Sequence, residues 1–587
     1  MNGARSIIIE EGGSSAQEET CRRRTAESGR GRGGRWWSCI WPAAALALLA
    51  FGVVKNIGHP LLWNDEGETA MFARRVLDYG YPKVHDGKNV VYMMELPDRT
   101  AGIDLRRDAY IGSGWGHFYF GALGEMAARR VDDPYLKTAL LRLPFALAGL
   151  AGIVLMAAAA APLFGPSRYH RRAAITAFFL LEALSVPLAL HLREMRYYAL
   201  VIFLAAAILF LYMRRTAGRL RPGPYIVLTT AALWLLNMTF PAAFFPVLAA
   251  LGIGEGARVL TRATNVQRAA GTLLPAGCAC LLAVPTFLYF RTFSIAVQYA
   301  VLFPSTAATL KQEAFKVFRL FWTADWLPLI LAVKTVSLVL WAVWRLGGKK
   351  GGFLGPAERR KIAWSSGLTV YALLHAAVVI RAAFPVTYDR YVIVLQPVFA
   401  LILILDSAAV WGVLASIRPS STKRAARLGF AGVLAILTVL TGAEKSRLLR
   451  ERAYELFHAP VGPMDTIVDF IRSRYPNPEH LVIATNYEEP VLMYYLGSRV
   501  IFGYVGNNLE ADRKAIPDVI VLRRRSAPTN GEFIKLLGKA GYRPVEIRIE
   551  DSWTNTSPEV SPGDIRHRFR TVWAKDRRRA PIVYVMQ

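Results

Sequence analysis

The sequence HPLLWNDEGETAMFARRVLDYGYP occupies residues 59–82 and directly follows the first long apolar run of the chain. It places Asp65, Glu66 and Glu68 within one helical turn of one another, at the predicted edge of a membrane. On a helix, Asp65, Glu68 and Thr69 would share one face, whereas Glu66 would point elsewhere. The residues that follow are amphipathic, so they predict a helix that lies along the membrane surface and not a second span.

Long apolar runs make up much of the 587-residue chain, in which 53% of residues are hydrophobic. Most runs are about 17–25 residues long, the length that crosses hydrocarbon as a helix. The sequence lacks the alternating segments of about ten residues that form membrane barrels, so helices must satisfy the backbone in lipid. The predicted fold is an all-α polytopic membrane domain with about 11 transmembrane helices, at 36–57, 138–163, 173–190, 197–213, 225–238, 240–253, 271–290, 327–344, 363–380, 391–412 and 428–443.

Clusters of lysine and arginine indicate how these helices are oriented. The net charge is +28, and basic residues recur in alternate loops, at 168–172, 214–221, 255–268, 345–361 and 418–427. This positive-inside pattern places these loops and the N-terminus in the cytoplasm of a plasma (inner) membrane protein. Nucleic-acid binding is not expected, because the charge follows the loops and forms no continuous basic face. The segments predicted to face outward are 58–137, 191–196, 291–326 and 381–390.

The two ends of the chain differ from the membrane domain at 36–443. Residues 1–35 are polar and rich in Gly, Ser and Arg, which predicts a disordered cytoplasmic tail. An odd number of spans places residues 444–587 outside. There, strands are predicted at 481–486, 499–504 and 519–524, and helices at 488–497 and 531–542. This alternation predicts a C-terminal extracytoplasmic α/β domain, and it contains no glycine-rich phosphate loop.

Arginine is scarce in short outer loops, yet HLREMRYY (191–198) contains Arg193 and Arg196 around Glu194. His191 and Tyr197 add further polar groups to this short segment. One interpretation is a pair of side chains that reach toward lipid headgroups from the interface. The density of ionisable residues favours the other interpretation, a binding site.

A second basic segment, RAAFPVTYDRYVIVLQP (381–397), places Arg381 and Arg390 outside, with Asp389-Arg390-Tyr391 at the start of a span. The planar guanidinium of arginine matches phosphate oxygens, and the Tyr391 hydroxyl adds a donor. An interfacial Arg–Tyr anchor is the alternative. The acids at 65–68 likewise have two interpretations: helix capping, or a general base beside a basic, partly dry cleft.

These motifs resemble those of the GT-C glycosyltransferases, especially the branch of the protein O-mannosyltransferases and the aminoarabinose lipid A transferase. Asp65-Glu66 followed by AMFARRVLDYGYP resembles the family's acidic pair, amphipathic helix and Gly-Tyr-Pro turn. GHFYFGALG (116–124) with Arg142-Leu-Pro resembles the end of the first outer loop and the second span. REMRYYAL (193–200) and DRYVIVLQP (389–397) resemble two later motifs. Residues 1–215 and 380–400 carry the resemblance, and the middle matches by span pattern alone.

The resemblance implies an enzyme that transfers a hexosyl or pentosyl group from a polyprenyl-phosphate donor to an extracytoplasmic protein, lipid or glycan. Asp65 would deprotonate the acceptor, with Glu66 as the second acid of the catalytic pair. Arg193, Glu194, Arg196, Tyr197, Arg390 and Tyr391 would bind substrate, with arginines stabilising the departing phosphate. The resemblance leaves a divalent metal open, because Glu68 and Glu194 depart from the family's motifs.

Two other classes of protein are compatible with the sequence. A transporter or flippase of a lipid-linked sugar would hold phosphate with the same arginines, but its essential charges should lie near the midplane. The acids and arginines described above cluster at the outer edge instead. Glu182, Lys334 and Asp406 are predicted within spans, where charged residues face protein or water more often than lipid, and no chemistry is assigned to them. A membrane scaffold would leave the acids and arginines unexplained. The enzyme is the favoured hypothesis.

Overall fold

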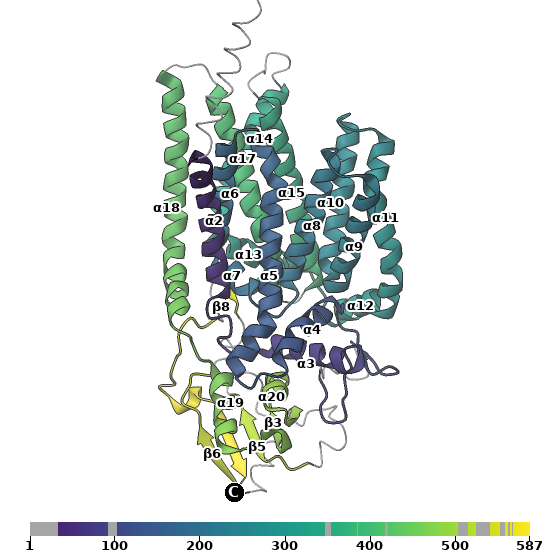
Figure 1. Cartoon of the computed structure of the whole chain (residues 1–587), viewed down its shortest axis with the longest axis vertical. Helices are drawn as coiled ribbons and strands as arrows, with labels where there is room; N and C mark the ends of the chain where they lie inside the picture. Colours follow the sequence, from purple (N-terminus) through teal and green to yellow (C-terminus); the bar gives the residue numbers. More distant parts are fainter. Residues whose placement is uncertain are drawn as a thin grey trace, which may run out of the picture.

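The computed structural model describes residues 33–91, 102–346, 354–383, 386–416, 421–502, 515–523, 541–551, 558–561, 564–565 and 567–586. A bundle of long helices forms one end of the molecule, and a small mixed sheet forms the other (Figure 1). Residues 1–32 of the predicted tail and 531–540 of a predicted helix lie outside the described residues.

The long helices run mainly along the longest axis of the molecule (Figure 1). They are α2 (Gly33–Val54), α5 (Pro134–Ala160), α6 (Arg168–Ala183), α8 (Tyr198–Thr216), α9 (Pro222–Thr239), α10 (Pro241–Leu260), α11 (Val266–Tyr289), α14 (Leu327–Leu346), α15 (Pro356–Ala382), α17 (Gln396–Ser416) and α18 (Ser421–Phe457). Shorter helices connect them: α7 (Val186–Leu192), α12 (Thr292–Leu302), α13 (Ala307–Ala324), α16 (Asp389–Val392) and the 3₁₀ turns η1 (Ala161–Phe164) and η3 (Ile393–Leu395).

Local sequence signals explain where several of these helices begin. Asp133 precedes α5 and accepts a hydrogen bond from the Leu136 amide at 2.6 Å, with proline at the first helical position. Ser185 caps α7 and Asn265 caps α11 in the same way. Each cap satisfies an amide that has no partner within its helix, so these polar residues mark the ends of apolar segments.

Each of the predicted spans lies on a helix, so the polytopic helical fold is confirmed. Among the described residues, 7 helices are long and apolar enough to cross a membrane, or up to 9 if each bent pair counts as one span. The bent pairs are α6 with α7, at 78°, and the two parts of α18, at 58°. The predicted spans on α2 and α9 are not among these nine. The apolar part of α2 covers only Ile40–Val54, and α9 carries Asn237 and several threonines.

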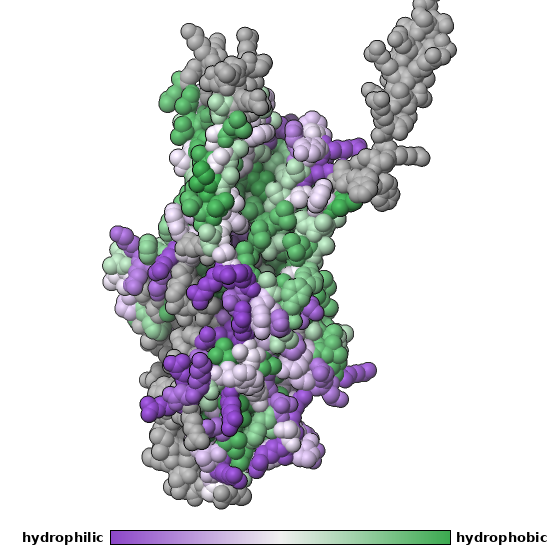
Figure 2. Space-filling model, turned by 90° about the vertical axis from the view of Figure 1, so that its left-hand side faces the viewer, coloured by the Kyte–Doolittle hydropathy of each residue, from purple (hydrophilic) through white to green (hydrophobic). Residues whose placement is uncertain are grey.

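The amphipathic helix α3 (Asn64–Tyr79) and the largely apolar helix α4 (Gly116–Ala128) cross the lower end of the bundle (Figure 1). They separate the long helices from the α/β region. Figure 2 shows apolar residues over the upper part of one face and a denser gathering of hydrophilic residues over the lower part. The helix predicted to lie along the interface is therefore placed where the apolar bundle gives way to a polar region.

The C-terminal region contains a five-stranded sheet in the order β4-β3-β5-β9-β6. Its strands are β3 (Val482–Thr485), β4 (Arg499–Phe502), β5 (Val519–Leu522), β6 (Tyr542–Glu546) and β9 (Ile582–Met586). β3 pairs in parallel with β4 and β5, and β9 is antiparallel to β5 and β6. α19 (Pro463–Arg474) and α20 (Glu489–Leu496) accompany the sheet, so the predicted α/β domain is present. α18 continues to Phe457, beyond the predicted domain boundary at 444.

The α/β domain packs directly against α3. A Cβ atom added to Gly67 would lie 2.7 Å from Val491 Cγ2 and 2.9 Å from the Val491 amide nitrogen. Only glycine permits this approach of α20 to α3. The Tyr495 hydroxyl of α20 also accepts a hydrogen bond from the Leu62 amide at 3.2 Å. The domain therefore holds the start of α3 from below while the membrane helices hold it from above.

Candidate active site

Asp65 lies in the first turn of α3, at the junction of the bundle and the α/β domain. The helix begins after Trp63, whose backbone is extended, and ends at Gly80, whose φ of 81° lies in the left-handed region that glycine adopts freely. Beyond its first turn, α3 is buried through Ala70, Phe72 and Ala73. The Asp65 side chain keeps 21% of its surface exposed, so it is the accessible acid of this turn.

Two guanidinium groups from distant parts of the chain flank the Asp65 carboxylate. Arg196 Nη2 lies 3.6 Å from Asp65 Oδ2, and Arg390 Nη2 lies 3.4 Å from the same oxygen. Arg196 Nη1 also donates to the Asp65 main-chain oxygen and to Thr69 Oγ1, both at 3.0 Å. Charge-assisted hydrogen bonds are normally about 2.7–2.9 Å long. The longer separations leave the Asp65 carboxylate able to accept a proton from another donor.

Arg390 is buried between aromatic rings and a second acid. Its guanidinium carbon lies 4.9 Å from the centre of the Trp63 ring and 4.2 Å from that of Tyr388. Its Nη1 donates to Glu559 Oε1 at 2.6 Å. Rings and carboxylate hold the guanidinium plane in one orientation, because cation–π contact and a charged hydrogen bond act on different parts of it.

The two arginines each keep one donor unused. Arg196 Nε and Arg390 Nε are buried and have no hydrogen-bond partner among the described residues. Buried donors are usually satisfied, because an unpaired one costs about 1–3 kcal/mol. Two such donors beside one carboxylate indicate a place where an anion binds.

Glu66 points away from Asp65 and is fully buried, with 0% of its surface exposed. Arg142 binds it through two hydrogen bonds, from Nε at 2.8 Å and from Nη2 at 2.5 Å. The Met195 amide also donates to Glu66 Oε1 at 2.8 Å. Glu66 therefore joins α3 to α5 and to the loop that carries Arg196.

Glu68 faces the same side of α3 as Asp65 and is half-buried. Burial raises its pKa to about 7, although the nearby Arg196 opposes this effect and Asp65 and Glu489 add to it. Near neutral pH, a larger fraction of Glu68 carboxyl groups is therefore protonated than of ordinary carboxyl groups. Glu68 therefore lies next to Asp65 but, among the described residues, forms no ion pair with Arg196 or Arg390.

The other charged residues of the second outer loop form a separate buried network. His191 Nδ1 contacts Glu194 Oε1, and His191 Nε2 lies 3.8 Å from Asp389 Oδ2. Burial raises the pKa of Glu194, an effect that the nearby His191 opposes. Arg193 forms an ion pair with Glu455 of α18, with 2.6 Å between Arg193 Nη2 and Glu455 Oε1. Of the basic residues predicted at the site, Arg196 and Arg390 meet Asp65, whereas Arg193 does not.

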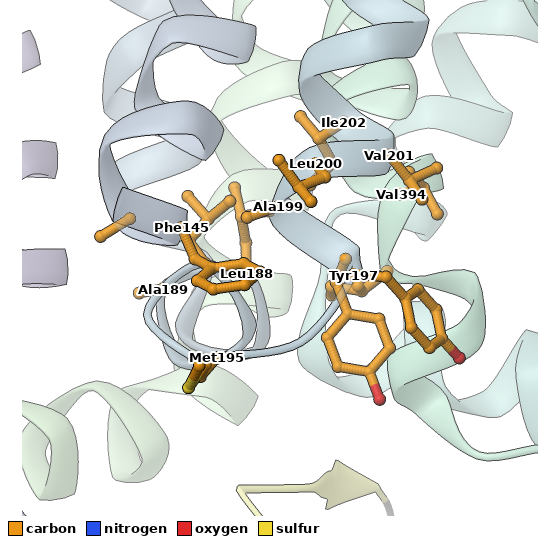
Figure 3. Close-up of a cluster of buried hydrophobic side chains, with 14 of the residues drawn as sticks. Phe145, Leu188, Ala189, Met195, Tyr197, Ala199, Leu200, Val201, Ile202 and Val394 are labelled. Atoms are coloured by element: carbon orange, nitrogen blue, oxygen red, sulfur yellow. The ribbon is translucent and has the colours of Figure 1, made fainter. Parts of the chain in front are cut away.

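Aromatic side chains form one wall beside the arginines. Tyr197 stacks on Phe240 at 4.6 Å, and Phe240 lies 6.5 Å from Tyr391 in a similar orientation. Figure 3 shows Met195 and Tyr197 at the lower edge of an apolar cluster that includes Phe145, Leu188 and Val394. The apolar cluster therefore anchors the start of α8, which fixes Tyr197 and the adjacent Arg196.

Sequence reasoning missed three residues of this site. Glu559 precedes the short strand β7 (Val560–Ser561), and no local pattern links it to Arg390. Trp63 precedes the acidic residues but carries no ionisable group, and Arg142 was noted only within its Arg-Leu-Pro motif. Arg142 could have been found as a charge inside an apolar run, where a partner is required. Arg381, in contrast, is exposed in the last turn of α15 and does not reach the site.

A narrow cavity of about 40 Å³ lies behind the site, between the membrane loops and the α/β domain. Its lining includes Trp63, Glu66, Arg193 and His567 but not Asp65. A single water needs about 10–15 Å³ by this measure, so the space holds only a few waters. In the described part of the chain, no group of three or more His, Cys, Asp or Glu side chains is arranged to hold a metal ion.

No family model and no curated protein sequence matches the chain. Several solved structures resemble it over most of its length. ArnT from Cupriavidus metallidurans bound to undecaprenyl phosphate has a TM-score of 0.49 and 15% identity, covering 93% of this chain and 98% of that one. The AglB oligosaccharyltransferase from Archaeoglobus fulgidus with a dolichol-phosphate has a TM-score of 0.47 and 11% identity, covering 83% and 70%.

A third similar structure is the arabinofuranosyltransferase AftD from Mycobacteria. Its TM-score is 0.45 at 16% identity, and the match covers 94% of this chain and 40% of that one. Scores and identities this low describe overall shape and assign no residue role or substrate to the chain. In its sequence motifs, the chain resembles the GT-C glycosyltransferases.

Proposed function

We propose that the protein is a membrane glycosyltransferase that moves a sugar from a polyprenyl-phosphate donor to an extracytoplasmic acceptor. The observation that carries this proposal is the accessible Asp65 carboxylate beside Arg196 and Arg390, at the end of an apolar helix bundle. A carboxylate can take a proton from an acceptor, and guanidinium groups can hold a phosphate. The membrane would bring the lipid-linked donor to this end of the bundle.

In the proposed reaction, the acceptor hydroxyl or amine gives its proton to Asp65. The acceptor atom attacks the anomeric carbon of the sugar from the face opposite the phosphate. The bond between that carbon and the phosphate oxygen breaks, and its electron pair stays on the lipid phosphate. This single displacement inverts the anomeric centre and needs one base.

The departing phosphate gains negative charge, which Arg390 and Arg196 stabilise through their unused donors. Both side chains are held in place before the donor arrives, so little reorganisation is needed during the reaction. Tyr197 and Tyr391 line the same region and bind the donor. Arginine is the suitable residue because its charge persists when it is buried.

The other predicted site residues, Glu66, Glu194 and Arg193, act by positioning the residues that bind substrate. We assign Glu66 and Glu194 positioning roles, since Glu66 is bound to Arg142 and Glu194 to His191. Arg193 is held by Glu455, so it joins α18 to the second outer loop. Asp65 then remains as the base, because it is the acid of the first turn that is both exposed to substrate and flanked by cations.

Released lipid phosphate is the direct test of this function. Purified protein would be incubated with a panel of polyprenyl-phosphate hexoses and pentoses, with and without candidate acceptors. We expect one donor to yield free polyprenyl phosphate and a product with inverted anomeric configuration. A product with retained configuration would contradict the single-displacement mechanism.

Arg390→Ala is expected to weaken donor binding by at least about tenfold, since a hydrogen bond to a charged group contributes about 1.5–3 kcal/mol. Arg390→Lys should recover part of the affinity, because lysine keeps the charge but lacks the two-pronged geometry. Binding of a non-transferable polyprenyl-phosphate sugar analogue would be measured by calorimetry.

Arg381→Ala is the matched control, because Arg381 belongs to the same outer segment but is exposed. It should bind like wild type. Melting temperatures of all three variants are needed, since Arg390→Ala leaves Glu559 buried without this partner. Equal donor affinity in wild type and Arg390→Ala would remove Arg390 from the binding site.

The proposed orientation places the α/β domain outside the cytoplasm. A reporter that is active only in the cytoplasm, fused after Gln587, should therefore be silent, and the same reporter fused within the 255–268 loop should be active. A reporter that is active after Gln587 would place Asp65 on the cytoplasmic side, because α3, which carries Asp65, and the α/β domain lie at the same end of the molecule (Figure 1).

A transporter remains the alternative function, and the intramembrane charges do not favour it. Lys334 Nζ lies 3.4 Å from Asp406 Oδ2, and Asp406 also accepts hydrogen bonds from Ser337 and Ser365, both at 2.7 Å. This group is satisfied by its own members, so it stabilises the packing of α14, α15 and α17. Glu182 of α6 is buried without a hydrogen-bond partner among the described residues, but the cations that could hold a lipid phosphate lie at the ends of the bundle.

A further inference from the structure

A second cavity lies among the ends of α5 and α8, η1 and the starts of α6 and α15. These helix ends are at the opposite end of the bundle from α3 (Figure 1). Its volume is about 650 Å³, far more than that of the cavity beside Trp63. We call it the arginine cavity, because its twelve lining residues comprise eight uncharged ones and four arginines: Ala158, Ala161, Pro162, Leu163, Gly165, Pro166, Pro356 and Ala357, with Arg171, Arg214, Arg219 and Arg360.

The four arginines come from four different segments. Arg171 lies in the first turn of α6, Arg214 in the last turn of α8, Arg219 in the following loop and Arg360 near the start of α15. The four arginines span 189 residues of the sequence, and like charges around one space repel. An anion in the cavity removes this repulsion.

Within the described part of the chain, no acid neutralises these arginines. Among the described residues, none of the four forms an ion pair, and no lining residue is acidic. Glu358, the acid closest in sequence to Arg360, lies beside Gly355 and Gly412 and accepts a hydrogen bond from Lys361. Arg171 Nη2 donates to the Gly165 carbonyl at 3.0 Å, while its buried Nε has no partner in the described part of the chain.

The rest of the lining is apolar and contains the start of a long helix. Ala158, Ala161 and Leu163 form the side next to α5 and η1, with no hydrogen-bonding side chain. On the other side, Pro356 and Ala357 begin α15, a helix of 27 residues without a side-chain cap at Gly355. The first turn of this helix also carries Glu358, whose carboxylate lies beside Gly355, so the arginines and not the helix start supply the attraction for an anion. An apolar wall beside a charged rim suits an amphiphile better than a freely soluble ion.

We propose that the arginine cavity binds the phosphate of an anionic phospholipid from the membrane leaflet at this end of the bundle. The guanidinium groups hold the phosphate, and the small apolar residues accept the first part of an acyl chain. Basic pockets between membrane helices bind anionic headgroups by the same forces. This site is separate from Asp65, so it does not depend on the proposed reaction.

The test compares phospholipids on the detergent-solubilised full-length protein by native mass spectrometry. Dioleoylphosphatidylglycerol should form a retained one-to-one complex with wild type, and zwitterionic dioleoylphosphatidylcholine should not. Arg214→Gln combined with Arg360→Gln should weaken the phosphatidylglycerol complex by at least about tenfold. Arg221→Gln combined with Arg268→Gln is the matched control, because it removes two exposed charges from the same end of the bundle but outside the cavity.

Ala158→Trp provides a second variant that keeps every charge and fills the cavity, and it should also weaken the complex. Equal phosphatidylglycerol binding by wild type, the double arginine variant and Ala158→Trp would overturn the proposal. Inorganic phosphate that raises the melting temperature as much as phosphatidylglycerol does, through the same arginines, would show a site for soluble anions and overturn the lipid assignment.

Discussion

Asp65→Asn is expected to lower the rate of sugar transfer by about 10²–10⁴, the usual effect of losing a general base, and by more for a weakly nucleophilic acceptor. Asparagine keeps the size of the side chain and can still accept a hydrogen bond, but it cannot take up the acceptor's proton. Arg196 keeps its contacts with the Asp65 main-chain oxygen and Thr69, so the site should stay assembled. Donor binding should therefore remain close to that of wild type.

The measurement is single-turnover transfer with saturating donor, together with donor affinity and melting temperature for each variant. Glu68→Gln is the matched control, because Glu68 lies on the same face of α3, one turn away from Asp65. Unlike Asp65, Glu68 forms no ion pair with Arg196 or Arg390 among the described residues. The substitution should cost much less in rate. A folded Asp65→Asn protein that turns over like wild type would exclude Asp65 as the base, and full activity in all acidic variants would favour the transporter.

The sequence alone predicted the parts of the fold that depend on local pattern. Apolar runs located every long helix of the bundle, and the amphipathic residues after Asp65 predicted α3 along the interface. The strands at 482–485, 499–502 and 519–522 were also expected. The ends of the helices were harder to predict, because helices extend beyond the apolar residues that cross the membrane. α15, for example, has 27 residues, more than its apolar stretch contains.

The candidate site shows where sequence reasoning stops. Three acids in one helical turn look alike in sequence, yet Asp65 meets two arginines, Glu66 is enclosed with Arg142, and Glu68 has neither environment. The difference follows from contacts with residues 76 to 325 positions away, which no local pattern contains. Arg193 and Arg196 differ in the same way, because a turn in the loop sends one to Glu455 and the other to Asp65.

Glu66→Gln is expected to reduce the free energy of unfolding by about 3–5 kcal/mol, because it leaves the buried guanidinium of Arg142 without its counter-charge. Loss of a helix cap alone would cost only about 1 kcal/mol. The larger value follows from the burial of both partners, with side chains 6% and 0% exposed. The measurement is the denaturant or thermal unfolding of the purified protein in one defined detergent.

Asp78→Asn supplies the matched control on the same helix. Its partner Arg129 lies 3.3 Å away, but both side chains are substantially exposed, at 40% and 50%. Solvent screens such a pair, so the substitution should cost about 0.2–1 kcal/mol. A second comparison replaces both buried partners, Glu66→Gln with Arg142→Met, and should restore part of the lost stability because no unpaired charge remains.

These variants also separate folding from chemistry at the two neighbouring acids. Glu66→Gln should lose activity in proportion to the folded protein that remains, since the Met195 amide and Arg142 hold the site through Glu66. Asp65→Asn should lose much more activity than stability, because Asp65 lies 3.4–3.6 Å from its two arginines and is partly exposed. If Glu66→Gln were as stable as wild type and inactive, while Asp65→Asn retained activity, Glu66 would be the base and its contact with Arg142 would have to open during catalysis.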